Sequence, residues 1–153
     1  MDALTEAGRA ELRRQARSLH EVIEGLPPQA LDWRPGPDTN SLAILVTHAW
    51  GAAEAWTARA AGQEIPRDRD AEFTIETTKA GLDRLIDQGL ERIEGILDAV
   101  EPDGYAEARP ASAAGDRLTR ASCLIRAIQH TQEHVGQALL TRQLWEQQSG
   151  RSA

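Results

Sequence analysis

Cysteine and aromatic residues are scarce in this chain of 153 residues. Cys123 is the single cysteine, which excludes an intrachain disulfide and favours a reducing compartment. We expect this thiol to fill space in the core as a small hydrophobe. The aromatic residues are four tryptophans, one tyrosine and one phenylalanine. Because aromatic and β-branched residues favour strands, their scarcity disfavours an extensive β-sheet.

Long apolar runs and clusters of positive charge are also missing. No run approaches the ~18 to 20 apolar residues that a membrane span needs, and the first residues lack the apolar segment of a signal peptide. The formal net charge is −7 and the basic residues are scattered along the chain, which argues against binding a phosphate backbone. We therefore expect a soluble, cytoplasmic protein with neither nucleic acid nor membrane as a partner.

Apolar residues recur at spacings of three and four, which predicts helices at about 4–25, 41–61, 79–100 and 119–147. Pro27 ends the first helix, Asn40 or Ser41 caps the second, Gly62 ends it, and Thr119 caps the last. No hairpin signal and no alternating run long enough for a sheet is evident. The pattern predicts an all-α four-helix bundle over 1–148, with long connecting loops that permit a crossover and a flexible tail at 149–153.

Three of the four histidines have the spacing of a metal site. His130 and His134 lie four apart in an apolar helical segment, and His48 lies on an apolar face of another predicted helix. Residues four apart project from one face, so a third imidazole from a neighbouring helix can complete the site. His20 has no partner at ligand spacing, and we expect it to be a hydrogen-bonded residue near the core.

Three neutral imidazoles favour zinc, nickel, copper or iron over calcium or magnesium. A site with three protein ligands leaves coordination positions open, as in catalytic zinc sites, where the pKa of bound water falls to about 7. The segment HTQEH also fits the H-x-x-E-H pattern of inverted zinc proteases. Glu133, however, lies about 100° round the helix from His134, which favours an exposed or supporting role.

Two segments, LDWRPGPDTNSLAILVTHAWGAAEAW and HTQEHVGQALLTRQLW, resemble the DinB-like family. The resemblance extends over essentially the whole chain in order and spacing. It implies a bundle of up-down-down-up order and a divalent metal, usually zinc or nickel, on His48, His130 and His134. It also implies kinship with enzymes that use small thiols, such as mycothiol-dependent maleylpyruvate isomerase and bacillithiol S-transferases, and with metal-dependent hydrolases.

Further roles follow from the resemblance and from helix position. Trp33 is expected to pack the long loop over the bundle, and Asn40 to cap the second long helix. Trp56 and Trp145 are expected in the core, with a pocket wall as the alternative. Two further candidates lie on roughly the same side of the last helix as His134. Gln137 is a candidate to hydrogen-bond a ligand on the metal, and Arg142 to meet an anionic group of a thiol cofactor.

Two functions remain open at this point. In the first, the chain is a metal-dependent enzyme that acts through a low-molecular-weight thiol of the mycothiol or bacillithiol type, as an S-transferase or isomerase, or through activated water as a hydrolase. In the second, it is a non-catalytic stress-response binding protein with a structural metal. The expected partners of the enzyme are a small thiol or an electrophilic substrate, and a homodimer is a reasonable assembly. The sequence leaves the metal, the substrate and the pairing face undefined.

Overall fold

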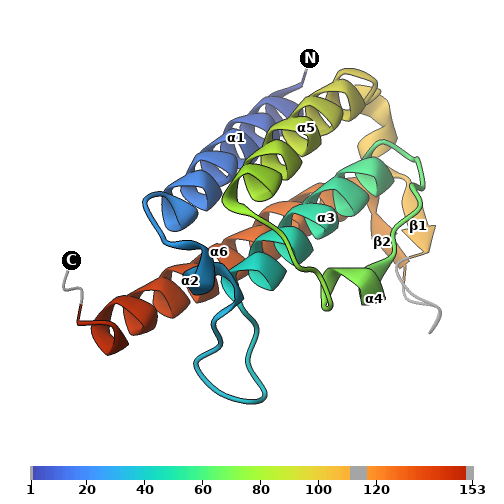
Figure 1. Cartoon of the computed structure of the whole chain (residues 1–153). Coiled ribbons are helices and arrows are strands. Elements are labelled where there is room, and N and C mark those ends of the chain that lie inside the picture. Colours follow the sequence, from blue (N-terminus) through green and yellow to red (C-terminus); the bar gives the residue numbers. More distant parts are fainter. Residues whose placement is uncertain (1, 111–116, 151–153) are drawn as a thin grey trace.

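The computed structural model describes residues 2–110 and 117–150 (Figure 1). Its long elements are four helices: α1 (Ala3–Ile23), α3 (Leu42–Ala60), α5 (Lys79–Asp98) and α6 (Arg120–Gln148). Their bounds differ from the predicted ones by no more than two residues at either end. The prediction of an all-α bundle is therefore confirmed. The division into one domain over 1–148 and a tail stays a prediction, and the tail residues 151–153 lie outside the described residues.

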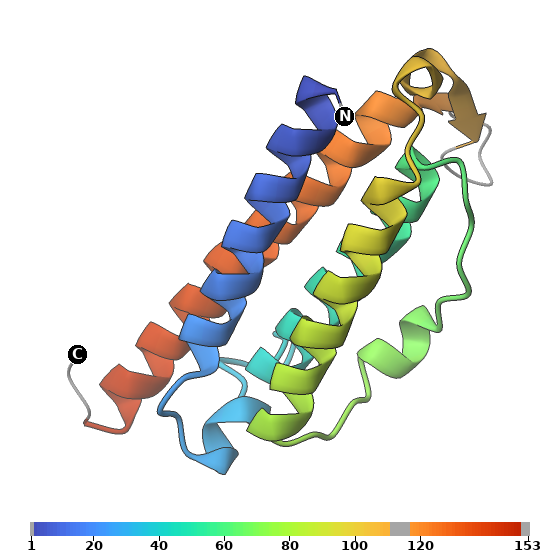
Figure 2. The same ribbon diagram turned by 90° about the horizontal axis from the view of Figure 1, so that it is seen from above.

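The four helices form the up-down-down-up bundle implied by the family resemblance. Helices α1 and α6 run in one direction, and α3 and α5 run in the other (Figures 1 and 2). Each helix packs on two neighbours, in the cyclic order α1, α5, α3, α6. The contact between α3 and α6 is the most extensive of the four, and these two helices are antiparallel.

The connections contain short elements that the sequence pattern did not predict. They are the helices α2 (Pro28–Asp32) and α4 (Arg69–Glu72), a 3₁₀ turn (Pro102–Ala106), and the strands β1 (Ala108–Pro110) and β2 (Arg117–Thr119). The two strands pair antiparallel, with Ala108 opposite Thr119. The expectation of no sheet is therefore wrong for this short pair of strands. Three residues can pair without an alternating apolar pattern where the connection doubles back before α6. The stretch between the strands, 111–116, lies outside the described residues.

Side-chain caps start each long helix, as their sequences suggest. Asp2, Ser41, Thr78 and Thr119 each accept a hydrogen bond from a backbone N–H in the first turn. For α3 the cap is Ser41, whose Oγ accepts from the N–H of Ile44 at 3.4 Å. The cap assigned to Asn40 through the family resemblance is therefore incorrect by one residue.

Helix α3 is buried on more sides than the other three. Every residue from 41 to 50 is buried, because α5 and α6 cover two sides of this segment and α4 contacts it as well. At the other end of the helix the buried guanidinium of Arg120 donates from Nε to the carbonyl oxygen of Ala60 at 2.7 Å. This bond fixes the start of α6 against the end of α3. Within the described residues, no helix is long and apolar enough to cross a membrane.

Trp50 joins α3 to α5 through a close approach that only glycine permits. Its Nε1 donates to the carbonyl oxygen of Ile86 at 3.0 Å, and its indole lies over Gly89. A Cβ at Gly89 would fall 2.3 Å from that Nε1, whereas a Cβ at Gly95 on the same helix would meet nothing within 4 Å.

Gly89→Ala should therefore destabilise the protein by about 1–3 kcal/mol, because the indole must move and its buried hydrogen bond lengthens or breaks. Gly95→Ala is the matched control and should stabilise by up to ~1 kcal/mol through helix propensity alone. Urea unfolding of both variants and the parent measures the difference. Two substitutions of equal effect would contradict this packing.

Candidate metal site

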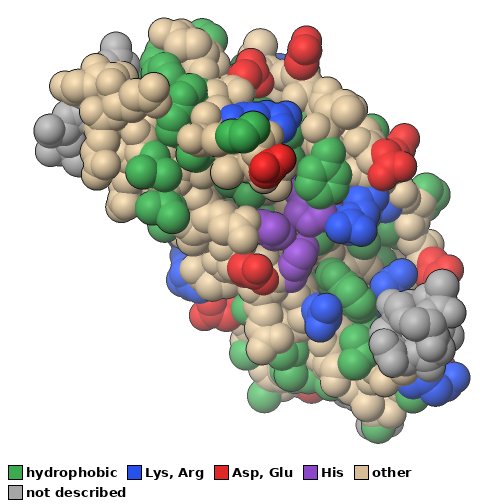
Figure 3. All heavy atoms as spheres, turned by 90° about the horizontal axis from the view of Figure 1, so that it is seen from below, with side chains coloured by type: hydrophobic (Ala, Val, Ile, Leu, Met, Phe, Trp, Pro, Cys, Tyr) green, Lys and Arg blue, Asp and Glu red, His purple; other side chains and the backbone are tan. Residues whose placement is uncertain are grey.

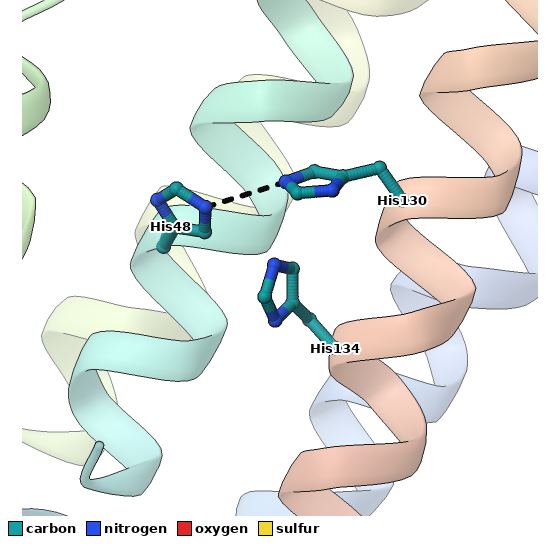
Figure 4. Close-up of side chains that lie close together, drawn as sticks. All are labelled: His48, His130 and His134. Atoms are coloured by element: carbon teal, nitrogen blue, oxygen red, sulfur yellow. Dashed lines mark hydrogen bonds between the residues drawn. The ribbon is translucent and has the colours of Figure 1, made fainter. Parts of the chain in front are cut away.

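The structure brings together His48, His130 and His134, the three histidines that the sequence singled out. His48 comes from α3, and the other two come from consecutive turns of α6 and point at it (Figure 4). One nitrogen from each ring can be chosen so that all three lie within 4.8 Å of one another. The space-filling view shows the three imidazoles side by side at the molecular surface (Figure 3). His48 is buried and the other two are partly exposed, so the cluster is open on one side.

His48 is held by a buried carboxylate, Glu72, and by Arg67, which is partly buried beside it. Its Nδ1 lies 2.9 Å from Oε2 of Glu72, and Glu72 in turn accepts two hydrogen bonds from Arg67, at 2.6 Å from Nε and 2.7 Å from a terminal nitrogen. A carboxylate held by arginine is ionised and accepts only, so Nδ1 of His48 carries the proton and donates. The lone pair of Nε2 is then free to face the other histidines.

Glu72 reaches His48 from α4, in the connection between α3 and α5. The carboxylate passes directly over Gly51, where a Cβ would fall 2.7 Å from its Oε1. Phe73 follows at the end of α4, with its ring centre 5.0 Å from that of His48. The connection thus acts as a strap that covers the outer side of the imidazole, and Gly51 leaves the space for it.

His134 is held in the same way as His48, through its Nδ1. Its Nδ1 lies 2.8 Å from Oε1 of Gln137, an acceptor, so Nδ1 donates. Its Nε2 is buried and has no hydrogen-bond partner. Buried nitrogens in native proteins almost always have a partner, and this one faces two other imidazoles. Nε2 of His130 lies 3.3 Å from Nε2 of His48. The donor set and the orphaned nitrogen fit a divalent metal ion.

The protonation states agree with this arrangement. Burial, together with the repulsion of a positive charge by the neighbouring His134 and His48, lowers the pKa of His130 to about 4. Burial also lowers the pKa of His48, and this effect outweighs the opposing hydrogen bond to Glu72. Both imidazoles are therefore neutral at pH 7, and neutral imidazole is the form that binds a metal.

The two other candidate residues lie in different places. Gln137 is beside the cluster, but it contacts His134 itself, which gives it a positioning role. Arg142 does not point to the cluster. One of its terminal nitrogens donates to the carbonyl oxygens of Glu21, Val22 and Glu24 at 2.8, 3.2 and 2.9 Å. This guanidinium caps the carboxyl end of α1, which corrects the expectation that it meets an anionic ligand.

The remaining histidine, the cysteine and Glu133 have the structural roles that the sequence predicted for them. Nδ1 and Nε2 of His20 contact Asp83 and Asp87 on α5, at 2.9 and 3.0 Å. Cys123 is buried in the core, and burial raises the pKa of its thiol. Glu133 is exposed, and the cluster found among the described residues contains no carboxylate, which removes support for the protease pattern.

Two tryptophans pack against each other, and a third lines a surface hollow. Trp33 packs edge-on against Trp145, with ring centres 5.7 Å apart, and so holds the long connection before α3 to α6 as expected. Trp56 is partly buried against the core and also lines a surface hollow, so both readings of it hold.

Glu72 and Arg67 were missed by sequence reasoning. Both lie in a connection rich in charged residues, where nothing local distinguishes these two from their exposed neighbours. Gly51, in the middle of an apolar helix directly after Trp50, was the one available signal, because glycine inside a helix often marks a close approach.

Comparisons with known proteins agree with this fold. A solved structure of a conserved protein from Enterococcus faecalis superposes with a TM-score of 0.77 at 17% identity, and the match covers 94% of this chain and 97% of that one. A mycothiol-dependent maleylpyruvate isomerase, solved as a histidine-to-alanine mutant, superposes with a TM-score of 0.66 at 12% identity. That match covers 89% of this chain and 62% of the isomerase. No curated protein sequence matches the chain.

The sequence itself matches a family over most of its length. Residues 11–138, which span α3, α5 and all three histidines of the cluster, match the DinB superfamily. The chain therefore belongs to the DinB superfamily.

Proposed function

We propose that this protein is a metal-dependent enzyme whose metal is held by Nε2 of His48, His130 and His134. The observation that carries the proposal is the buried, partnerless Nε2 of His134, which faces two imidazoles that are neutral at pH 7. Three nitrogen donors favour zinc or nickel. The imidazoles of His130 and His134 remain partly exposed, so an exogenous ligand has access.

A divalent metal at this position supplies a positive charge that lowers the pKa of a bound thiol or water. The similarity to a mycothiol-dependent isomerase supports the thiol, and we propose a reaction of the S-transferase or isomerase type, with metal-assisted hydrolysis as the alternative. Glu72 and Gln137 keep the Nδ1 protons in place and so present Nε2 of His48 and His134 to the metal. Arg67 holds the Glu72 carboxylate in place with two hydrogen bonds.

A cytoplasmic location and a homodimer remain predictions from the sequence. The single cysteine supports the first. Size-exclusion chromatography with light scattering measures the second.

Loss of a predicted ligand should strongly weaken metal binding. His134→Ala should lower zinc affinity by more than the ~10- to 100-fold expected from losing an outer partner of a ligand. His20→Ala is the matched histidine control and should leave affinity unchanged, since His20 contacts Asp83 and Asp87 instead. Competition with a chromophoric chelator gives both affinities. Equal zinc affinity in the two variants would contradict the assignment.

Glu72→Gln should weaken zinc binding by about 10- to 100-fold, because the neutral amide polarises His48 less and no longer pairs with Arg67. Glu133→Gln changes an exposed glutamate next to His134 and should leave zinc affinity unchanged. Nitrogen chemical shifts of the imidazoles report whether Nδ1 of His48 carries the proton. An unshifted zinc affinity in Glu72→Gln would show that the carboxylate does not support the ligand.

The enzymatic proposal is tested by turnover of electrophilic model substrates with mycothiol, bacillithiol or glutathione. We expect turnover with at least one thiol, its loss after metal removal, and its recovery when zinc or nickel is restored. Activity that survives both metal removal and His134→Ala would exclude a metal-centred mechanism.

A non-catalytic role predicts a different result from the same samples. The three ligands join α3 to α6, so a metal bound only to the folded state stabilises it by mass action. A sharp fall in melting temperature on metal removal, with no turnover of any thiol, hydrolytic or isomerase substrate, would favour that alternative.

A further inference from the structure

The outer side of the α3–α6 contact has two hollows, one on each side of the histidine cluster. The first is a cavity of about 310 Å³. It is lined by Pro35, Asp38, Thr39, Asn40, Leu45, Gln137, Leu140, Thr141 and Leu144. We call it the leucine cavity.

The leucine cavity adjoins the histidines directly. Gln137, which lines it, accepts the hydrogen bond from Nδ1 of His134 at 2.8 Å. Leu45 lies three residues before His48 on α3, which is just under one helical turn and about 4.5 Å along the axis. Since α3 and α6 are antiparallel, Leu45 and Gln137 lie toward the same end of the site. A molecule held at the histidines therefore has this cavity as its neighbour.

The cavity leaves large apolar side chains uncovered. Among the described residues, Ile125, Leu139, Leu140 and Leu144 are the exposed large hydrophobics. Leu140 is 55% exposed and Leu144 is 36% exposed, and both line the leucine cavity. Two half-exposed leucines beside the buried Leu45 gain free energy when an apolar group covers them.

The second hollow, on the other side of the histidines, has the opposite character. It is a smaller cavity of about 170 Å³, and Trp56, Arg59 and Arg67 are among its lining residues. The guanidinium carbons of Arg59 and Arg126 lie 4.8 and 5.4 Å from the ring centre of Trp56. Figure 3 shows basic side chains beside the histidines on this side, and hydrophobic side chains on both sides of the cluster. The second hollow is thus lined by charged side chains of both signs, including Glu64, whereas leucines dominate the leucine cavity.

We propose that the leucine cavity is a binding subsite for the uncharged apolar group, alkyl or aryl, of a ligand whose polar donor atom lies at the histidines. This subsite proposal rests on the proposed function, because it names the class of electrophilic substrate. That substrate has an apolar group next to its reactive end. Leu140 and Leu144 determine specificity, and Gln137 forms the boundary between subsite and metal ligand. The cavity volume, near the lower end for small-molecule sites, limits this group to a short chain or a single ring.

A series of straight-chain alkyl hydroxamates with the zinc-loaded protein tests the proposal without requiring turnover. The hydroxamate binds the metal through its oxygens, and isothermal titration calorimetry gives the affinity for each chain length. Each added methylene should raise affinity roughly fourfold until the cavity is filled, after which the gain stops. The double variant Leu140→Asn, Leu144→Asn should bind the shortest hydroxamate normally and lose most of the dependence on chain length.

Leu139→Asn is the matched control. Leu139 is 44% exposed on the same helix and does not line the cavity, so this variant should keep the dependence of the parent. The double variant and the control change exposed positions only, and unchanged melting temperatures confirm that the bundle is intact.

Four outcomes separate the subsite from the proposed function. Hydroxamates that bind with no dependence on chain length, or a dependence unaffected by the double variant, overturn the subsite alone. A dependence that the double variant removes, in a protein without thiol or hydrolytic turnover, supports the subsite and counts against the enzyme. A protein that neither retains zinc nor binds any hydroxamate overturns both.

Discussion

The antiparallel contact between α3 and α6 is the constraint on which the site depends. It places a buried helix face with one histidine against a helix that presents two more on consecutive turns. Three imidazoles this close, two of which have nitrogens held by Glu72 and Gln137, leave nitrogen lone pairs directed at one another. Buried polar atoms without partners cost free energy, so the fold holds this arrangement at the expense of stability.

Support for the site comes from outside the four-helix core. The strap between α3 and α5 carries Glu72 and Arg67 onto His48, and Gly51 gives the carboxylate room. A buried ion pair of this kind contributes little net stability, since desolvation offsets much of the attraction. Its consequence is local: it fixes which nitrogen of His48 is protonated. The bundle therefore supplies the positions of the histidines, and the connection between α3 and α5 supplies the orientation of His48.

The helices and the histidine trio were predictable because both follow from local periodicity. Spacing of three and four gives the helix ranges, and the i, i+4 pair at His130 and His134 shares a face whatever the tertiary structure. The third histidine of the cluster, His48, needed either the apolar pattern around it or the family resemblance. Cys123 and His20 also followed from pattern alone.

What the sequence could not provide were contacts fixed by tertiary packing. Arg142 lies eight residues after His134, roughly 80° round the helix, and α6 has α1 on that side; spacing alone cannot show which neighbour a guanidinium meets. Glu72 contacts a residue 24 positions away through a connection of mixed polar character. The short β1–β2 pairing likewise depends on where the chain doubles back, which leaves no repeat to detect.

X-ray absorption spectroscopy of the protein loaded with one equivalent of zinc tests the central claim most directly. The account predicts three imidazole nitrogens and at least one light-atom ligand that an added thiol replaces with sulfur, with the imidazole signal reduced in His48→Ala, His130→Ala and His134→Ala. A spectrum without histidine scattering, or a folded protein that binds no stoichiometric metal, would contradict it.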